Sequence, residues 1–342
     1  MLTPQSVGAR FPTVAADLGP LLLVVVDTEE EFDWGAPFSP SNTSCRAMRS
    51  VHRVQAVLDR FGVRPTYVID YPVATEPDGY EPLLEIFRDG RCAIGAHLHP
   101  WVNPPQVEPI SSVNSFACNL EPALEREKLQ RLRATVAERF GSTPRVYKAG
   151  RYGLGAASVD TVRALGFDVD ASINPHWDFA VHGGPSFAAF DARPFWFGGE
   201  PRLLEVPCSS GFVGAAGPLA PALHRWASTP ALERLRMPGI LNRLGLASRI
   251  MLSPEGYTLD EMVRLADTLI ARGVGTLTLS YHSPSAAVGH TPYVQSGRDL
   301  DEFLGRLEGF LEHFFGRPGS RTTTHEAFRD SLVNMRESGA GP

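Results

Sequence analysis

The feature that most constrains the fold is the repeated alternation of apolar, strand-like segments with segments of helical periodicity. The strand-like segments lie at 21–27, 64–70, 91–97, 145–149, 166–172, 202–207 and 275–282. Segments with apolar residues at helical spacing lie at 46–62, 81–90, 121–141, 156–165, 258–272, 299–315 and 325–336. Strands that are apolar throughout pair in parallel and carry helices on both faces. The alternation therefore predicts an α/β fold, a distorted (β/α) barrel of about seven parallel strands.

Two stretches do not follow this alternation. Residues 174–200 are rich in Phe, Trp, Gly and Pro, and residues 215–250 have the pattern of short helices without a strand. Long irregular segments in compact domains usually serve a site or are disordered. We therefore expect a single barrel domain over residues 1–342, with an insertion at about 174–256 that covers or borders a site. The first strand is not followed by a glycine-rich phosphate fingerprint, which argues against a dinucleotide-binding fold.

Charge, hydropathy and cysteine usage exclude several classes of protein. The 342 residues include 32 Lys and Arg against 38 Asp and Glu, and the net charge of −6 argues against a nucleic-acid partner or a polybasic membrane-binding role. The longest apolar run, 21–26, is too short to span a membrane, and the N-terminal segment lacks the apolar region of a secretory signal. Cys45, Cys92, Cys118 and Cys208 lie far apart, which suits reduced thiols. We expect a cytoplasmic protein.

Titratable residues lie at the carboxyl ends of most of the expected strands. In a (β/α) barrel the catalytic groups sit at this end of the strands. The residues found there are Asp27 and Glu29, His97 and His99, Lys148 and Arg151, Asp170, and His282. Near the ends of the second and sixth strands lie Asp70 and Glu205. We expect the strand-end groups to surround one concave mouth, with residues 174–200 at its border.

The stretch GAHLHPW carries the sharpest chemical signal. His97 and His99 are two residues apart, so on extended backbone they share one face, and Pro100 fixes the chain after them. Asp27 and Glu29 obey the same geometry. Two imidazoles with a carboxylate suit a divalent transition metal, and we expect His97 and His99 to share one with Glu29. The alternatives are hydrogen-bonded core histidines and a solvated acidic loop.

The remaining strand-end residues have both a functional and a structural interpretation. KAGRYGLG, residues 148–155, places cations and the aromatic Tyr152 in a glycine-rich turn. The structural alternative is a plain barrel loop with a surface arginine. His282 ends an apolar strand, where a lone histidine is often structural, but it is expected opposite the other groups. Asp170 either orients a cation or is a turn residue.

Taken together, these segments resemble the motifs of the polysaccharide deacetylase family, the NodB-type carbohydrate esterases. Its members are similar in having an acidic motif after strand one, a histidine motif, an Arg-containing turn, an Asp motif and a late LxH motif. The matching segments here are VVVDTEEEFDW, GAHLHPW, KAGRYG, DVDAS and LTLSYH, and they extend over residues 21–285. The nearest similarity is to a lipopolysaccharide-biosynthesis-like branch, where HSPS and GHTPYV segments follow the last strand. The resemblance implies a barrel of the NodB-homology type.

Three positions depart from the family pattern. The usual first motif has two adjacent Asp, a base and then a metal ligand, but Thr28 stands in the second place and Glu29 is the nearest replacement. The usual histidine motif spaces its ligands by four, but position 101 is Trp, so His99 takes that place. The usual Arg of the third motif aligns with Lys148 or, after a small shift, with Arg151.

The resemblance implies metal-assisted hydrolysis of an N-acetyl group on a sugar of a polysaccharide or lipopolysaccharide precursor. Asp27 is then the base, His282 the acid, and Lys148 or Arg151 the partner that keeps Asp27 ionised. The metal ligands implied are Glu29, His97 and His99, with Zn²⁺ as the expected ion. Trp101, Tyr152 and Asp170 are expected to contact the substrate, an N-acetylated sugar or glycan, together with aromatic residues between Trp177 and Trp196.

Two other functions remain open at this point. The first is a sugar-binding or regulatory protein on the same fold without metal chemistry, which the missing second Asp favours. The second is a metal-dependent amidohydrolase that acts on a small molecule. The sequence also allows a homo-oligomer.

Overall fold

The predicted barrel is confirmed in a computed structural model, which describes residues 2–12, 19–199 and 202–337. Its seven main parallel strands are β1 (Leu21–Thr28), β2 (Thr66–Ile69), β3 (Ala93–Leu98), β4 (Val146–Ala149), β5 (Val169–Asp170), β7 (Leu203–Glu205) and β10 (Thr276–His282). They correspond one for one to the expected strand segments. The sheet has the order β10-β1-β2-β3-β4-β5-β7-β6, with β6 (Phe195–Phe197) antiparallel at one edge and β11 (Arg321–Thr322) also parallel to β1.

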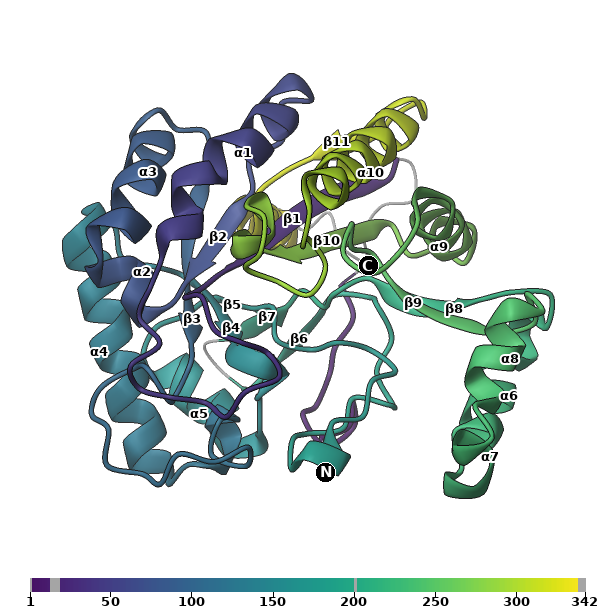
Figure 1. Ribbon diagram of the computed structural model, residues 1–342, viewed down its shortest axis with the longest axis horizontal. Coiled ribbons are helices and arrows are strands. Elements are labelled where there is room, and N and C mark those ends of the chain that lie inside the picture. The colour runs from purple at the N-terminus through teal and green to yellow at the C-terminus, as the bar shows by residue number, and fades with distance from the viewer. Residues whose placement is uncertain (1, 13–18, 200–201, 338–342) are drawn as a thin grey trace.

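Helices cover the outside of this curled sheet (Figure 1). They are α1 (Val51–Arg60), α2 (Tyr71–Thr75), α3 (Pro77–Arg88), α4 (Pro122–Phe140), α5 (Ala156–Ala164), α9 (Leu259–Ala271) and α10 (Gly297–Phe315). The last helix, α11 (His325–Glu337), packs instead against the residues of the barrel interior. Side-chain caps and glycine fix their ends: the Thr258 hydroxyl accepts the N–H of Glu261 at the start of α9, and Gly141 takes the left-handed conformation after α4. Among the helices that the structure describes, none is long and apolar enough to cross a membrane.

Alternate strand positions fill the barrel interior. The buried cluster there contains Leu21, Leu23, Val25, Val68, Val146, Val169, Leu204, Phe328 and Leu332, the last two from α11. Because strand side chains alternate with a period of two, Asp27 is the next inward position of β1 after Val25. Lys148 follows Val146 on β4 in the same way, and His97 is its register partner on β3. The apolar interior therefore ends in charged and imidazole groups at the carboxyl end of the strands.

A hairpin closes the barrel between β7 and β10. The backbone N–H of Ser209 donates to the Thr278 carbonyl at 3.2 Å, and the N–H of Ser280 donates to the Leu252 carbonyl at 3.1 Å. Ser209 and Leu252 directly flank β8 (Ser210–Val213) and β9 (Ser248–Met251), which pair antiparallel. At the far end of the hairpin, α6 (Ala220–Ala227), α7 (Pro230–Arg234) and α8 (Met237–Arg243) project away from the barrel (Figure 1).

The expectation of short helices without a strand at 215–250 is wrong at its end, because β9 begins at Ser248. Residues 174–200 likewise contain a strand, β6. Both strands are short, and each is defined by its antiparallel partner: β6 pairs with the next strand, β7, and β9 pairs with β8, more than thirty residues before it. A short segment without its partner carries a weak strand signal. The extent of a single domain over 1–342 remains a prediction, and residues 1, 13–18, 200–201 and 338–342 lie outside the described part.

Candidate active site

One cavity of about 540 Å³ opens at the carboxyl ends of the strands. Most of the sequence-predicted site residues line it: Asp27, Glu29, His97, His99, Arg151, Tyr152 and His282. These residues come from the ends of β1, β3 and β10 and from the loop after β4; β10 lies beside β1, β3 lies beside β4, and β2 separates the two pairs. Segments far apart in the sequence therefore contribute several titratable side chains to one pocket.

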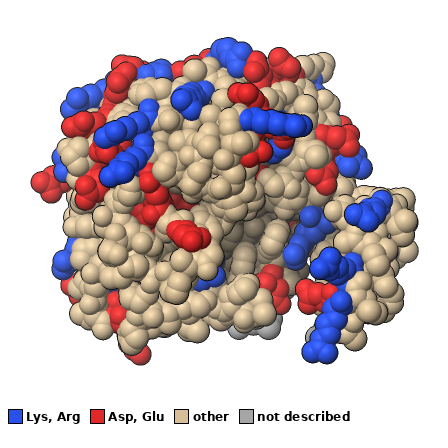
Figure 2. Space-filling view, viewed as in Figure 1, with Lys and Arg blue, Asp and Glu red and all other residues tan. Residues whose placement is uncertain are grey.

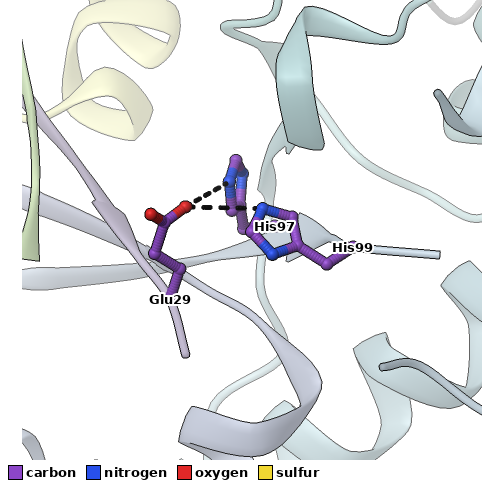
Figure 3. Close-up of side chains that lie close together, drawn as sticks. All are labelled: Glu29, His97 and His99. Atoms are coloured by element: carbon purple, nitrogen blue, oxygen red, sulfur yellow. Dashed lines mark ion pairs between the residues drawn. The ribbon is translucent and has the colours of Figure 1, made fainter. Parts of the chain in front are cut away.

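Three of these side chains converge on a common point (Figure 3). The Glu29 Oε2 atom lies 3.8 Å from His97 Nε2 and 3.4 Å from His99 Nε2. The two imidazole centroids are 4.6 Å apart, and all three side chains are buried. The strand geometry explains this convergence, because residues two apart on extended backbone project to one side.

This donor set fits a divalent metal. His97 Nδ1 donates to the Lys148 carbonyl at 2.9 Å, and His99 Nδ1 lies 2.7 Å from Glu30 Oε2, so both Nε2 atoms keep a free lone pair. Glu29 Oε1 is buried and has no hydrogen-bond partner. The Glu29, His97 and His99 ligand atoms all lie within 4.8 Å of one another. Two neutral imidazoles, a carboxylate and an unsatisfied buried oxygen are what a zinc-type site requires.

The ionisation of the triad agrees with this interpretation. Burial lowers the pKa of His99 to about 4 and also lowers the pKa of His97, which keeps both rings in the neutral, ligating form. Burial raises the pKa of Glu29 to about 7, and the neighbouring histidines only partly oppose this. Burial therefore outweighs the nearby charge of His282 at Glu29, and a bound cation would favour the carboxylate form.

A second layer of residues holds His99 in place. Glu30 accepts a hydrogen bond from Trp101 Nε1 at 2.7 Å as well as from His99, and the Trp101 ring stacks on the His99 ring with a centroid separation of 4.2 Å. Asp70 accepts the backbone N–H of Glu30 at 2.8 Å. Sequence reasoning missed Glu30, although it stands in the acidic run 29–31, because a run of three acids does not show which ones are buried.

Asp27 is clamped by a buried lysine. Lys148 Nζ lies 2.5 and 2.7 Å from the two Asp27 carboxylate oxygens and 3.0 Å from Ser280 Oγ. Burial opposes ionisation of Asp27, but the charges of Lys148 and His282 outweigh it and lower the pKa of this carboxyl. Burial likewise opposes the charge on Lys148, and Asp27 outweighs it and raises the lysine pKa.

His282 faces Asp27 across the cavity and is held by a second carboxylate. Its Nε2 atom lies 3.9 Å from Asp27 Oδ2, while its Nδ1 atom lies 2.8 Å from Glu255 Oε2. Glu255 Oε1 also accepts the backbone N–H of His282 at 3.1 Å. Burial acts to lower the pKa of His282, but Glu255 and Glu29 outweigh it and raise it to about 10. Glu255 was not predicted, because it follows β9 rather than a barrel strand.

Arg151 and Tyr152 line the cavity without touching Asp27. Both adopt left-handed backbone conformations, with φ of 53° and 59°, which residues other than glycine rarely do. The Arg151 guanidinium lies over the Phe116 ring at 4.2 Å and donates to the Ser112 carbonyl. Of the two alternatives for the partner of Asp27, the structure therefore places Lys148 there, and not Arg151.

Two of the residues expected to contact substrate do not reach the cavity. The Trp101 indole is buried beneath His99, where Glu30 uses its only donor. The Asp170 carboxylate is buried and accepts hydrogen bonds from the backbone N–H and the hydroxyl of Ser172, at 2.9 and 3.0 Å. Both side chains therefore contact other residues of the protein, and neither lines the cavity.

The insertion supplies part of the cavity wall. Asn174, Trp177, Asp178, Phe179 and His182 line it from the segment that was expected to border the mouth, while Trp196 is buried in the barrel interior instead. The Trp177 and Phe179 rings stack at 6.2 Å. Arg249, from β9, lies over Trp177 at 4.0 Å.

Comparison with known proteins gives a likeness of fold. No protein-family model matches the sequence, and no curated protein matches it at a significant level. The crystal structure of a candidate polysaccharide deacetylase from Mycobacterium smegmatis aligns with a TM-score of 0.56 and 16% identity, over 96% of this chain and 95% of that one. A candidate glycoside hydrolase/deacetylase from Parabacteroides distasonis aligns with a TM-score of 0.57 and 12% identity, over 92% and 71%. The chain therefore has the NodB-type barrel fold of the polysaccharide deacetylases.

Proposed function

We propose that the protein is a metal-dependent deacetylase that hydrolyses an N-acetyl group on a sugar. The observation that carries this proposal is the shared cavity: the Glu29, His97 and His99 triad opens into the same space as Asp27 and His282. A metal site, an ionised carboxylate and a protonated imidazole within one pocket are the parts that amide hydrolysis needs.

Glu29, His97 and His99 are the residues that would hold the metal. A divalent cation bound there would polarise the acetyl carbonyl and acidify a water molecule. Asp27 is the proton acceptor for the attacking water, because it is ionised and faces the cavity. Lys148 keeps Asp27 charged and fixes its orientation through a bidentate contact. The lowered pKa of Asp27 makes this carboxylate a weak base. It is therefore suited to accept a proton from a water molecule that a metal has already made more acidic.

His282 is the proton donor to the departing amine. Its raised pKa, about 10, keeps the imidazolium form at neutral pH, and Glu255 orients the ring through Nδ1 so that Nε2 faces the cavity. General acid help of this kind accelerates a reaction by roughly 10²–10⁴-fold. Because Asp27 lies 3.9 Å away from Nε2, acid and base act on one small reacting group.

The cavity walls favour a sugar as the carrier of the acetyl group. Trp34, Trp177 and Tyr293 line the cavity, and aromatic faces with a few polar groups are typical of pockets that bind ring-shaped ligands. Trp34 lies edge-on to His282 at 4.9 Å, so a ring held by Trp34 lies next to the acid. The finer parts of the proposal are zinc as the ion and a polysaccharide or lipopolysaccharide precursor as the substrate. The HSPS and GHTPYV segments support the second of these.

We also propose a cytoplasmic location. The structure describes all four cysteines as free thiols, which suits a reducing compartment.

Metal content and acetate release test the proposal together. Protein purified without chelator is analysed for metals and then incubated with N-acetylated sugars and with a small N-acetylated amide. We expect metal binding and acetate release from sugars, and loss of both in His97→Ala/His99→Ala. The matched control, His52→Ala, removes a partly exposed histidine of α1 that does not line the cavity, and we expect it to leave both intact. Wild-type protein that binds sugar without metal or acetate release would instead be a binding protein, and release only from the small amide would indicate the other hydrolase.

A further inference from the structure

The projecting helices expose more large apolar side chains than they bury. We call residues 219–244, which contain α6, α7 and α8, the arm. Its exposed apolar side chains are Leu219 at 71%, Trp226 at 53%, Leu235 at 66%, Ile240 at 45% and Leu244 at 65%. Among the arm residues whose burial is described, Leu241 is the one large apolar side chain that is buried, beside Ala220 and Ala227. A helical element normally turns its apolar face inward, so these side chains indicate a missing partner.

The charge of the arm is opposite to that of the whole chain. Its charged residues are Arg225, Arg234, Arg236 and Arg243 against Glu233 alone, whereas the complete sequence has a net charge of −6. Figure 2 shows basic side chains gathered on the projecting lobe, while acidic ones are spread over the barrel. The net charge of the whole chain predicted no membrane-surface role, but the arm taken by itself is positively charged. An arm of this charge repels a second arm, which disfavours arm-to-arm pairing of two copies.

We propose that the arm is a peripheral membrane-binding element that docks on an anionic phospholipid bilayer. Leucine, isoleucine and tryptophan side chains beside arginines are the composition of segments that lie in the bilayer interface: the apolar groups enter the acyl boundary while the arginines pair with lipid phosphates. The excess of arginine over acid supplies charge complementarity to anionic lipids. This inference does not depend on the proposed chemistry.

The arm is attached to a strand that lines the cavity. The arm is carried on the β8–β9 hairpin, and Arg249 and Met251 of β9 line the cavity. The element that would hold the bilayer is therefore joined directly to the wall of the cavity. If the proposed function also holds, the enzyme acts on sugars displayed at a membrane surface.

Vesicle co-sedimentation of the full chain tests this inference. Vesicles of phosphatidylcholine alone are compared with vesicles of phosphatidylcholine and phosphatidylglycerol in equal parts. We expect binding to the anionic vesicles only, falling as salt rises from low to physiological concentration. The triple variant Arg225→Ala/Arg234→Ala/Arg243→Ala is expected to weaken the partition constant by about fivefold per arginine. Leu235→Glu/Leu244→Glu is expected to abolish binding.

A matched control separates the arm from general surface hydrophobicity. Val107→Glu/Ile110→Glu places the same two charges at exposed apolar positions of the loop before α4, and we expect it to bind as wild type does. Circular dichroism of each variant confirms folding, and the arginine variant, which changes no buried group, keeps the test valid if the leucine variant unfolds. Absence of wild-type binding at low salt, or equal binding by the arm variants, would overturn the proposal. A dimer that the arm variants dissociate, without vesicle binding, would do the same.

Discussion

The buried pair of Lys148 and Asp27 makes a strong prediction about stability. The lysine side chain is fully buried and the aspartate nearly so, and two short contacts join them. Lys148→Met keeps the volume and removes the charge, which leaves an ionised carboxylate buried with no lysine. Breaking a buried pair from one side costs about 3–5 kcal/mol. Because the pair is shielded from water, we expect the free energy of unfolding to fall by an amount within this range, and not by the small amount typical of a surface pair.

A double-mutant cycle isolates this cost. In Asp27→Asn/Lys148→Met both charges are gone, so the free energy of unfolding should recover, with an interaction energy of about 1–3 kcal/mol. Urea unfolding, followed by circular dichroism in metal-free buffer, measures all four proteins. Arg298→Met, which breaks an exposed pair with Glu302 on α10, is the matched control and should change stability little.

The stability loss in Lys148→Met is expected to depend on pH, and the pKa of Asp27 sets the direction. In the wild type the folded pKa of Asp27 is lowered, so its contribution to stability is present above its unfolded pKa and is lost as pH falls through the folded value. In Lys148→Met burial dominates and raises the folded pKa above the unfolded one, so the penalty grows as pH rises between them. The variant should therefore lose less stability at about pH 4 than at about pH 7. A loss below about 1 kcal/mol at neutral pH, or one equal at both pH values, would refute this reasoning.

Three further changes probe the site and its support. Glu255→Gln removes the carboxylate that chiefly raises the pKa of His282, so the basic limb of the pH–rate profile should move to lower pH; an unmoved limb means that His282 is not the acid. Glu30→Gln should weaken zinc binding, measured by competition with a chelator, by about 10–100-fold, because it orients His99; unchanged affinity assigns Glu30 a purely structural role. Phe328→Ala, at the base of the barrel interior, should lower the free energy of unfolding by about 3–5 kcal/mol in urea titrations while metal binding persists; loss of metal would show that the two ends are coupled.

The strands could be predicted because their signal is local. The β1 segment is buried at every position, and a run of that kind is visible without knowing its neighbours. The β8–β9 hairpin could not be predicted in the same way, since Ser248–Met251 alternates buried and partly exposed residues over only four positions. Its pairing partner lies more than thirty residues away, and pairing, not composition, makes it a strand.

The site likewise contains residues that local geometry predicts and residues that only tertiary packing brings into place. Period-two geometry was enough to bring Glu29, His97 and His99 to one side, because it depends only on extended backbone. The residues that hold these groups, Glu30 and Glu255, depend on which loops pack against the barrel. Glu255 reaches His282 only because the hairpin closes the gap between β7 and β10. The spacing of residues in the sequence therefore does not predict that Glu255 lies next to His282.

The departures from the family pattern form one connected arrangement. Thr28 faces away from the cavity and donates its hydroxyl to the Val26 carbonyl, so a carboxylate at that position would not continue the inward series of Asp27. Glu29 does continue it, and its Oε2 atom lies nearest His99, the histidine that stands two residues before the usual position. Trp101, which occupies that usual position, stacks on His99 and donates to Glu30, which in turn accepts from His99. Relative to the motifs that the sequence resembles, the carboxylate stands one residue later and the imidazole two residues earlier, and the two differences meet in the contact between Glu29 and His99. Trp101→His alone therefore removes the stacking on His99 and the hydrogen bond to Glu30, and Thr28→Asp alone places a carboxylate away from the cavity. Neither change by itself builds the spacing of the family motifs.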